Sequence, residues 1–272
     1  MPDLAISLSG DGVTPGESYL EDTPVLRSHA GTQPDLFLRW NGIPAATVDV
    51  VVYLHGFSQL GSAMPLAEKV ASSGLDLSGR KRPTIAMLPR GNWLRYTWCD
   101  FPALLMVGID RLVEYGLRRF GQAMGRGTLA MDRFILAAHS GGGMPAVDMI
   151  AGARHPPDEL FVFDGLYGRD PSRGDPMQGL ETIDRWLGER LAREPEREAA
   201  LRVIYIEQQT GPFSRKVGEL ISGHLANVEP AVAAVLRHRY RVEVSRVQHS
   251  RIARRCLPEL LAGSDVEFDW SR

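Results

Sequence analysis

The stretch RFILAAHSGGG, residues 133–143, joins a short apolar run to a glycine-rich turn. An apolar run of this length, bounded by glycines, is typical of a buried strand. The residues that follow, Gly143–Gly152, have the character of a helix. A buried strand that passes directly into a helix is the repeating unit of a parallel sheet covered by helices. The stretch therefore predicts one strand inside such a sheet.

Similar runs extend this pattern over most of the chain. The expected strands are Val48–Leu54, Thr84–Leu88, Arg133–Ala138, Leu160–Asp164, Val203–Glu207 and, nearer the sheet edge, Arg241–Val247. The expected helices are Ala63–Ser72, Leu104–Phe120, Gly143–Gly152, Leu180–Leu191, Ala231–Arg237 and Ile252–Leu261. Strands that alternate with helices of about 10–15 residues predict βαβ units, and hence an α/β fold with a mostly parallel central sheet and helices on both faces.

Length and composition fit an ordinary globular protein. The 272 residues are 44% hydrophobic and 24% charged, and no internal repeat or low-complexity linker divides them. We expect a single domain over residues 1–272. Within residues 1–47, Ala5–Leu8 and Leu36–Trp40 are weaker strand candidates for one edge of the sheet. Residues 166–202 include a polar, turn-rich part that suits a rim or lid segment.

The charge balance and the two cysteines exclude several classes of function. A formal net charge of -2 gives no general attraction for nucleic acid or for an anionic membrane. Cys99 and Cys256 do not make a disulfide framework and are expected to be unpaired thiols in a reducing compartment. No secretory signal or membrane-spanning stretch is visible, so we expect a cytoplasmic protein without nucleic-acid or membrane partners.

The turn after the expected strand Arg133–Ala138 contains the clearest catalytic motif. Ala138-His139-Ser140-Gly141-Gly142 is close to the pattern G-x-S-x-G, with Ala138 in place of the first glycine. Small residues two before and two after the serine permit a tight strand-to-helix turn that exposes the serine oxygen. The alternative is that this is only a connection between a strand and a helix. The flanking strand and helix favour Ser140 as a nucleophile.

Four motifs together resemble the α/β-hydrolase fold serine hydrolases. VVYLHGFS resembles the strand and loop that form the oxyanion hole, and ILAAHSGGG the turn that bears the nucleophile. FVFDGLYG resembles a strand end that bears the catalytic acid, and VQHS the histidine loop. The resemblance covers about residues 48–262 and identifies no subfamily. It implies a serine hydrolase that needs no metal and no organic cofactor and acts on a small-molecule acyl substrate.

The resemblance also assigns the remaining catalytic groups. In this fold the order along the chain is serine, acid, histidine, which makes His249 the general base, with His224 as its only serious rival. The backbone N–H groups of Phe57 and Gly141 are the expected oxyanion-hole donors. The usual Gly-x-x-Asp after the seventh strand is missing, so the acid is either Asp164 or Glu207. We favour Asp164, because it ends an apolar strand and is followed by a glycine.

An aromatic segment follows the strand Thr84–Leu88 on the side where the nucleophile is expected. Ligands bind at the carboxyl ends of strands in such sheets, so Trp93, Tyr96 and Trp98 are candidates for a substrate-binding wall. The alternative is that these side chains only fill space beneath the rim. Ester hydrolysis is the broadest expectation for the reaction. An acyltransferase, an amidase or peptidase, and a non-catalytic binding member of the fold remain open.

Overall fold

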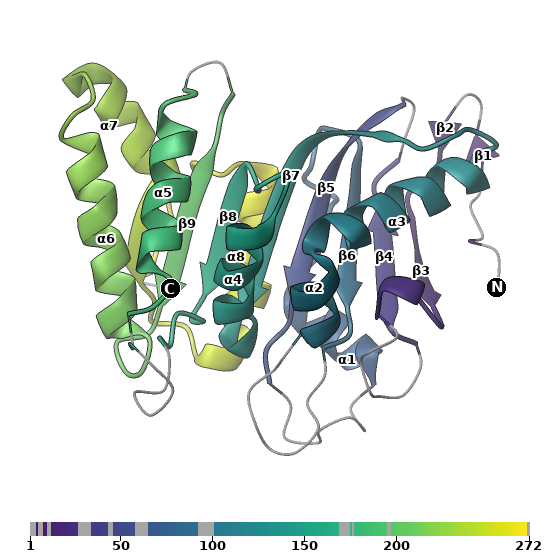
Figure 1. Cartoon of the computed structure of the whole chain (residues 1–272), viewed down its shortest axis with the longest axis horizontal. Helices are drawn as coiled ribbons and strands as arrows, with labels where there is room; N and C mark the ends of the chain where they lie inside the picture. Colours follow the sequence, from purple (N-terminus) through teal and green to yellow (C-terminus); the bar gives the residue numbers. More distant parts are fainter. Residues whose placement is uncertain are drawn as a thin grey trace.

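An eight-stranded sheet forms the centre of the computed structural model (Figure 1). The structure describes residues 4, 8–9, 12–26, 34–42, 46–57, 65–91, 101–168, 175, 177–194 and 197–270. The strands of this sheet are β3 (Gly16–Leu20), β4 (Leu36–Trp40), β5 (Thr47–Leu54), β6 (Thr84–Pro89), β7 (Ala130–His139), β8 (Glu159–Phe163), β9 (Ala200–Tyr205) and β10 (Tyr240–Val244). Their order is β10-β9-β8-β7-β5-β6-β4-β3. Strands β5 to β10 run parallel, whereas β3 and β4 are antiparallel additions at one edge.

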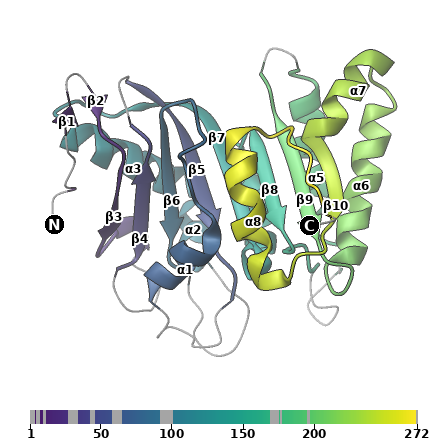
Figure 2. The same ribbon diagram turned by 180° about the vertical axis from the view of Figure 1, so that it is seen from behind.

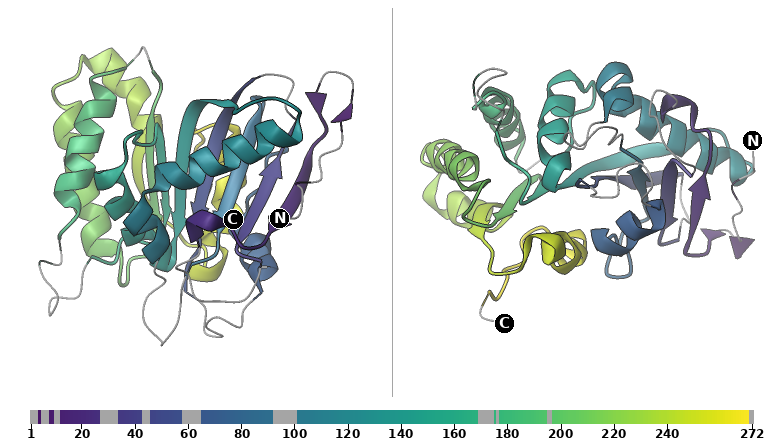
Figure 3. Two further views of the ribbon diagram at one scale, coloured as in Figure 1. Left: turned by 45° about the vertical axis from the view of Figure 1, so that its right-hand side comes forward. Right: turned by 90° about the horizontal axis from the view of Figure 1, so that it is seen from below.

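Helices cover both faces of the sheet. Among the described residues they are α1 (Leu66–Ser73), α2 (Pro102–Val107), α3 (Ile109–Ala123), α4 (Gly143–Gly152), α5 (Leu180–Leu191), α6 (Gly211–Leu225), α7 (Pro230–Arg239) and α8 (His249–Ala262). Figure 1 shows α2 to α6 in front of the sheet, and the reverse view in Figure 2 shows α1 and α8 on the opposite face. The view from below in Figure 3 shows the twisted sheet between these two helix layers.

Two buried apolar clusters hold the layers together, one on each face. The first contains side chains of α3, α4, α5 and α6, and the second contains side chains of α1 and α8. Neighbouring residues of β5 fall into different clusters: Val50 and Val52 face the first, and Val51 and Tyr53 the second. A strand buried on both faces reads as a continuous apolar run, which explains why VDVVVYL was visible in the sequence.

Most predicted elements are confirmed, with four corrections. The strand expected to end at Asp164 ends at Phe163. Of the expected helix Ala63–Ser72, residues 63–64 lie outside the described part of the chain, and α1 begins at Leu66. The expected helix Leu104–Phe120 is two helices, because Gly108 takes a positive φ of 84° between α2 and α3. The strand expected to reach Glu207 ends at Tyr205, and the one expected to reach Val247 ends at Val244. Helix α6 and strand β3 had not been predicted. The prediction that the last strand lies at the sheet edge is correct.

The amino-terminal expectations are confirmed in part. Leu36–Trp40 forms β4, paired antiparallel with β6. Of Ala5–Leu8, residues 5–7 lie outside the described part of the chain, and Leu8 belongs to the short hairpin β1 (Leu8–Ser9) and β2 (Gly12–Val13). A 3-10 turn, η1 (Pro24–Leu26), follows β3. The single domain and the lid role of residues 166–202 stay predictions.

A buried ion pair ties the edge strand β10 to its neighbour. The side chain of Arg202 on β9 is fully buried, and its guanidinium donates to Glu243 on β10 at 2.5 Å. The same guanidinium donates to the carbonyls of Ser264 and Val266, at 2.7 and 2.9 Å. Removing one partner of a buried pair leaves an uncompensated charge, so these contacts fix β10 and the segment behind it. The loop that delivers His249 is thereby anchored at its start.

No helix in the described ranges has both the length and the apolar character to cross a membrane.

Candidate active site

Ser140 occupies a strained turn at the carboxyl end of β7. Its φ is 52°, in the left-handed region that a residue with a side chain rarely adopts. The residues Ser140–Gly142 form a single 3-10 turn, η3, and α4 begins at Gly143. A β-carbon at Gly143 would lie 2.2 Å from the carbonyl oxygen of Gly165, so only glycine permits this close packing. The turn therefore places Ser140 at the start of a helix, as the sequence motif predicts.

His249 and Asp164 complete a chain of hydrogen bonds with Ser140. The Ser140 hydroxyl donates to His249 Nε2 at 2.8 Å, and His249 Nδ1–H donates to Asp164 Oδ2 at 2.5 Å. The three residues come from the ends of different elements: Ser140 follows β7, Asp164 follows β8, and His249 opens α8 after β10. This is the arrangement in which a base removes the serine proton while a carboxylate orients the base.

The environment of Asp164 keeps it ionised. Burial alone would raise its pKa, but hydrogen bonds from His249, the Thr210 hydroxyl and the Ile206 N–H outweigh burial and lower the pKa below its ordinary value. Glu207, the other candidate acid, is half exposed and forms an ion pair with Arg215. The structure therefore brings Asp164, and not Glu207, to His249.

The predicted oxyanion loop, His55–Phe57, lies against Ser140. A β-carbon at Gly56 would come within 2.6 Å of Ser140 Cβ and 3.1 Å of its Oγ, so glycine alone allows this approach. Gly141 lies in the first turn after the nucleophile, where backbone N–H groups have no partner within the helix. Both predicted donors thus belong to segments next to the serine oxygen. Their role as an oxyanion hole stays a prediction.

Comparison with solved structures identifies the fold. A fluorophosphonate-binding serine hydrolase of Staphylococcus aureus aligns with a TM-score of 0.53 at 9% identity, over 93% of this chain and 100% of that chain. The feruloyl esterase module from Clostridium thermocellum, complexed with sinapinate, aligns with a TM-score of 0.51 at 10% identity, over 92% and 88%. The chain has the α/β-hydrolase fold. By sequence it matches no protein-family model and no curated protein.

Within this α/β-hydrolase fold, His55 fixes the oxyanion loop. It is buried, and its Nε2 accepts a hydrogen bond from the Gly91 N–H at 2.9 Å. Since Nε2 accepts, the proton of the neutral ring is on Nδ1, which donates to the Gly56 carbonyl at 2.9 Å. His55 is therefore a structural group of the loop.

His139, which precedes the nucleophile, holds the backbone of His249. Its Nε2–H donates to the His249 carbonyl at 2.9 Å, and the two rings lie with centroids 4.8 Å apart. Burial, together with the repulsion that would arise if both histidine rings were protonated, lowers the pKa of His139 to about 4, so the ring is neutral at physiological pH. This role was not predicted, because the partner is 110 positions away along the chain.

Tyr167 is a second residue that sequence reasoning missed. Its hydroxyl lies 3.4 Å from Ser140 Oγ, longer than an ordinary hydroxyl hydrogen bond. Burial raises the pKa of this phenol, so it remains a proton donor. The residue lies in FVFDGLYG, three positions after Asp164, and the same turn therefore brings both side chains to the nucleophile.

The remaining candidates lie elsewhere. Trp93, Tyr96 and Trp98 are outside the described residues, so the aromatic substrate wall stays a prediction. The Nε2 atom of His224, the rival base, lies 2.7 Å from Asp184 Oδ1, and His224 makes no hydrogen bond with Ser140. Burial raises the pKa of the Cys256 thiol to about 12, which leaves it unreactive. The described residues contain no cluster of metal-ligating side chains.

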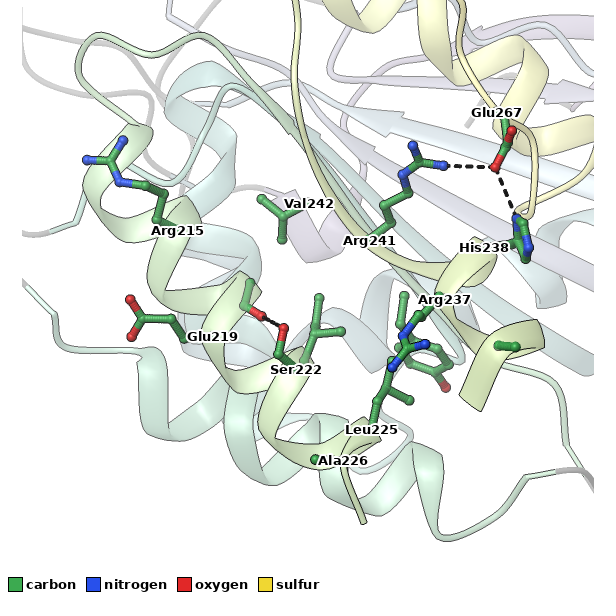
Figure 4. A pocket seen from close by; sticks show the side chains of 14 residues that line it. Arg215, Glu219, Ser222, Leu225, Ala226, Arg237, His238, Arg241, Val242 and Glu267 are labelled. Atoms are coloured by element: carbon green, nitrogen blue, oxygen red, sulfur yellow. Dashed lines mark hydrogen bonds and ion pairs between the residues drawn. The ribbon is translucent and has the colours of Figure 1, made fainter. Parts of the chain in front are cut away.

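A large groove elsewhere on the molecule lacks the features of a reaction site. It lies between α6, α7 and β10 (Figure 4). Glu267 pairs with both Arg241 and His238 in its lining, and the Ser222 hydroxyl donates to the Gly218 carbonyl. No nucleophile in the described lining faces a base. The hydrogen-bonded group at Ser140 is therefore the better candidate for chemistry.

The choice of Asp164 over Glu207 predicts a large difference between two matched variants. Asp164→Asn presents an amide N–H to His249 Nδ1, which favours the tautomer protonated on Nε2 and unable to accept the serine proton. We expect kcat/KM for ester hydrolysis to fall about 10⁴-fold. Glu207→Gln should change it less than about threefold, because it alters only a surface ion pair. A large loss in Glu207→Gln with little in Asp164→Asn would contradict the assignment.

The neutral, partly buried His139 predicts acid sensitivity of the fold. The unfolded chain takes up this proton near its ordinary pKa of 6.5, and the folded protein only near 4. The contribution of neutral His139 to the free energy of unfolding is therefore complete above pH 6.5. Up to about 3 kcal/mol of it is lost as the pH drops towards 4. Urea unfolding at about pH 7.5 and about pH 4.5 measures how far the free energy of unfolding falls on acidification. This fall should be about 2–3 kcal/mol smaller in His139→Gln than in wild type.

The matched control for this pH experiment is His238→Gln, which replaces a half-exposed ring on α7. It should show the wild-type loss on acidification. An equal loss in wild type and His139→Gln would contradict the assignment of this sensitivity to His139.

Proposed function

We propose that the protein is a serine hydrolase that cleaves carboxylic esters through an acyl-enzyme on Ser140. The observation that supports this most directly is the continuous pair of hydrogen bonds from Ser140 through His249 to Asp164. Each group has the state that the reaction needs: the serine donates, the imidazole accepts, and the carboxylate is ionised. The solved structures with similar folds are named as a serine hydrolase and a feruloyl esterase, which agrees with this class of reaction.

The proposed mechanism begins with attack of Ser140 on the ester carbonyl carbon. His249 Nε2 takes the hydroxyl proton as the new bond forms, and Asp164 stabilises the resulting imidazolium. The negative charge collects on the carbonyl oxygen, where the N–H groups of Phe57 and Gly141 donate to it. His249 then returns the proton to the leaving alcohol as the ester bond breaks. A water molecule, deprotonated by His249, then attacks the carbonyl carbon of the acyl-enzyme. The carboxylic acid is released, and Ser140 recovers its proton from His249.

Strain at Ser140 fits this use of the residue. A left-handed residue other than glycine costs about 1–2 kcal/mol and persists only where surrounding packing enforces it. Here the turn packs closely against neighbouring strand ends. A β-carbon at Gly142 would lie 2.5 Å from the carbonyl oxygen of Leu54, and one at Gly165 would lie 2.7 Å from that of Ser140. The packing holds the serine oxygen in place before substrate arrives, which supports a role as nucleophile.

A short p-nitrophenyl ester provides the test, since its leaving group is chromogenic and makes few demands on the substrate pocket. Wild type should release an initial burst of about one mole of p-nitrophenol per mole of enzyme, as the acyl-enzyme forms. Steady hydrolysis of the acyl-enzyme to the free acid should follow. Ser140→Ala should lose the burst and at least about 10³-fold of the rate. Ser222→Ala, a matched change in the groove beside α6, should behave as wild type. Full activity in Ser140→Ala would refute the proposed nucleophile.

A further inference from the structure

A buried lysine lies behind the oxyanion loop. Lys69, on α1, is 7% exposed. Its Nζ donates to two successive carbonyls of the loop, to Gly56 at 2.9 Å and to Phe57 at 2.8 Å. Neither the sequence motifs nor the reaction scheme above uses this residue. Lysine is rarely buried, because removing an ammonium group from water is costly, so the placement of Lys69 beneath this loop calls for a physical reason.

The geometry of a peptide unit connects Lys69 to the oxyanion hole. The Gly56 carbonyl and the Phe57 N–H belong to one planar, trans peptide, in which the two groups point in opposite directions. The Gly56 carbonyl accepts from Lys69 and from His55 Nδ1–H, which fills both of its acceptor positions. With the carbonyl held on that side, the N–H of the same peptide is turned to the other. Gly56 itself packs directly against Ser140.

Charge adds to this orientation. A hydrogen bond from an ammonium group is stronger than one from a neutral donor, and it draws electron density towards the carbonyl oxygen. Successive hydrogen bonds through one polarised group strengthen each other, so the N–H of that peptide becomes a better donor. A neutral side chain of similar size would fill the same space beneath the loop without this effect.

We propose that Lys69 is a positioning residue, which orients and polarises the Gly56–Phe57 peptide so that the Phe57 N–H stabilises the oxyanion formed by attack of Ser140. The inference rests on the proposed function, and it concerns the transition state more than substrate binding. As the Ser140 Oγ–carbon bond forms, the serine proton passes to His249 and the carbonyl π electrons move onto oxygen. Only then does the Phe57 N–H meet a full negative charge. Loss of Lys69 therefore lowers kcat more than it raises KM.

The test compares Lys69→Met with wild type in ester hydrolysis and in binding of an aliphatic trifluoromethyl ketone. The ketone adds Ser140 to its carbonyl, and the serine proton moves to His249, so it forms a stable hemiketal oxyanion in the same position. In Lys69→Met we expect kcat to fall about 10–100-fold, with KM within about threefold. The affinity for the ketone should fall by the same factor as kcat. A residue that only supports the fold would not link these two quantities.

Two further variants of Lys69 and one control variant show whether the loss of kcat comes from the charge of Lys69 or from a general effect of the substitution. Lys69→Arg keeps the charge and the donors, and should recover at least about tenfold of the lost kcat. Lys69→Gln keeps an N–H donor without the charge and serves if the methionine variant does not fold. Lys216→Met is the matched control, since it replaces an exposed lysine of α6 that pairs with Glu219, and it should behave as wild type.

The outcomes separate this inference from the proposed function. If wild type hydrolyses the ester and binds the ketone while a folded Lys69→Met or Lys69→Gln matches it in both, the role of Lys69 is refuted and the serine mechanism stands. If kcat falls while ketone affinity does not, the role is also refuted, because the oxyanion is then unaffected. If wild type has neither activity nor ketone binding, the proposed function fails and this inference fails with it.

Discussion

The hydrogen bond between His249 Nδ1 and Asp164 Oδ2 is the constraint on which the rest of the site depends. It joins residues 85 positions apart, and it forms only if the ends of β8 and β10 reach the same rim of the sheet. The parallel order β10-β9-β8-β7 achieves this, because every strand in it presents its carboxyl end on one side. The buried pair of Arg202 and Glu243 then fixes β10 against β9. The fold thus brings together groups that no local segment of the chain could.

The site also shows where local strain is offset by packing. Ser140 and Asp164 both have positive φ, at 52° and 45°, although neither is glycine. Aspartate tolerates this conformation better than most residues, whereas for the serine it reflects the forced turn between strand and helix. Interlocking backbone around Gly143 and Gly165 maintains both conformations. Burial of apolar side chains on two faces of the sheet provides the stability that such a site requires.

Sequence patterns predicted most of the sheet but missed two elements and several long-range contacts. The central strands of the parallel sheet were visible because burial on both faces makes each a largely continuous apolar run. Helix α6 was missed although Phe213, Val217, Ile221 and Leu225 recur every four residues, since glycine, proline and serine interrupt the pattern. Strand β3 was missed because, as an edge strand, it alternates exposed and buried residues over only five positions. His139, Tyr167 and Lys69, which lie near Ser140, are placed by contacts that the spacing along the chain does not encode.

Covalent labelling tests whether Ser140 is the activated nucleophile that the proposed mechanism requires. The folded protein would be treated with a fluorophosphonate, digested, and mapped by mass spectrometry. We expect one phosphonyl group per chain, attached to Ser140, with the fluoride displaced and the serine proton taken up by His249. Labelling should be lost in His249→Ala, which keeps the serine but removes its base. Attachment at another residue, or labelling of Ser140 at an undiminished rate without His249, would contradict the roles of Ser140 as nucleophile and His249 as base.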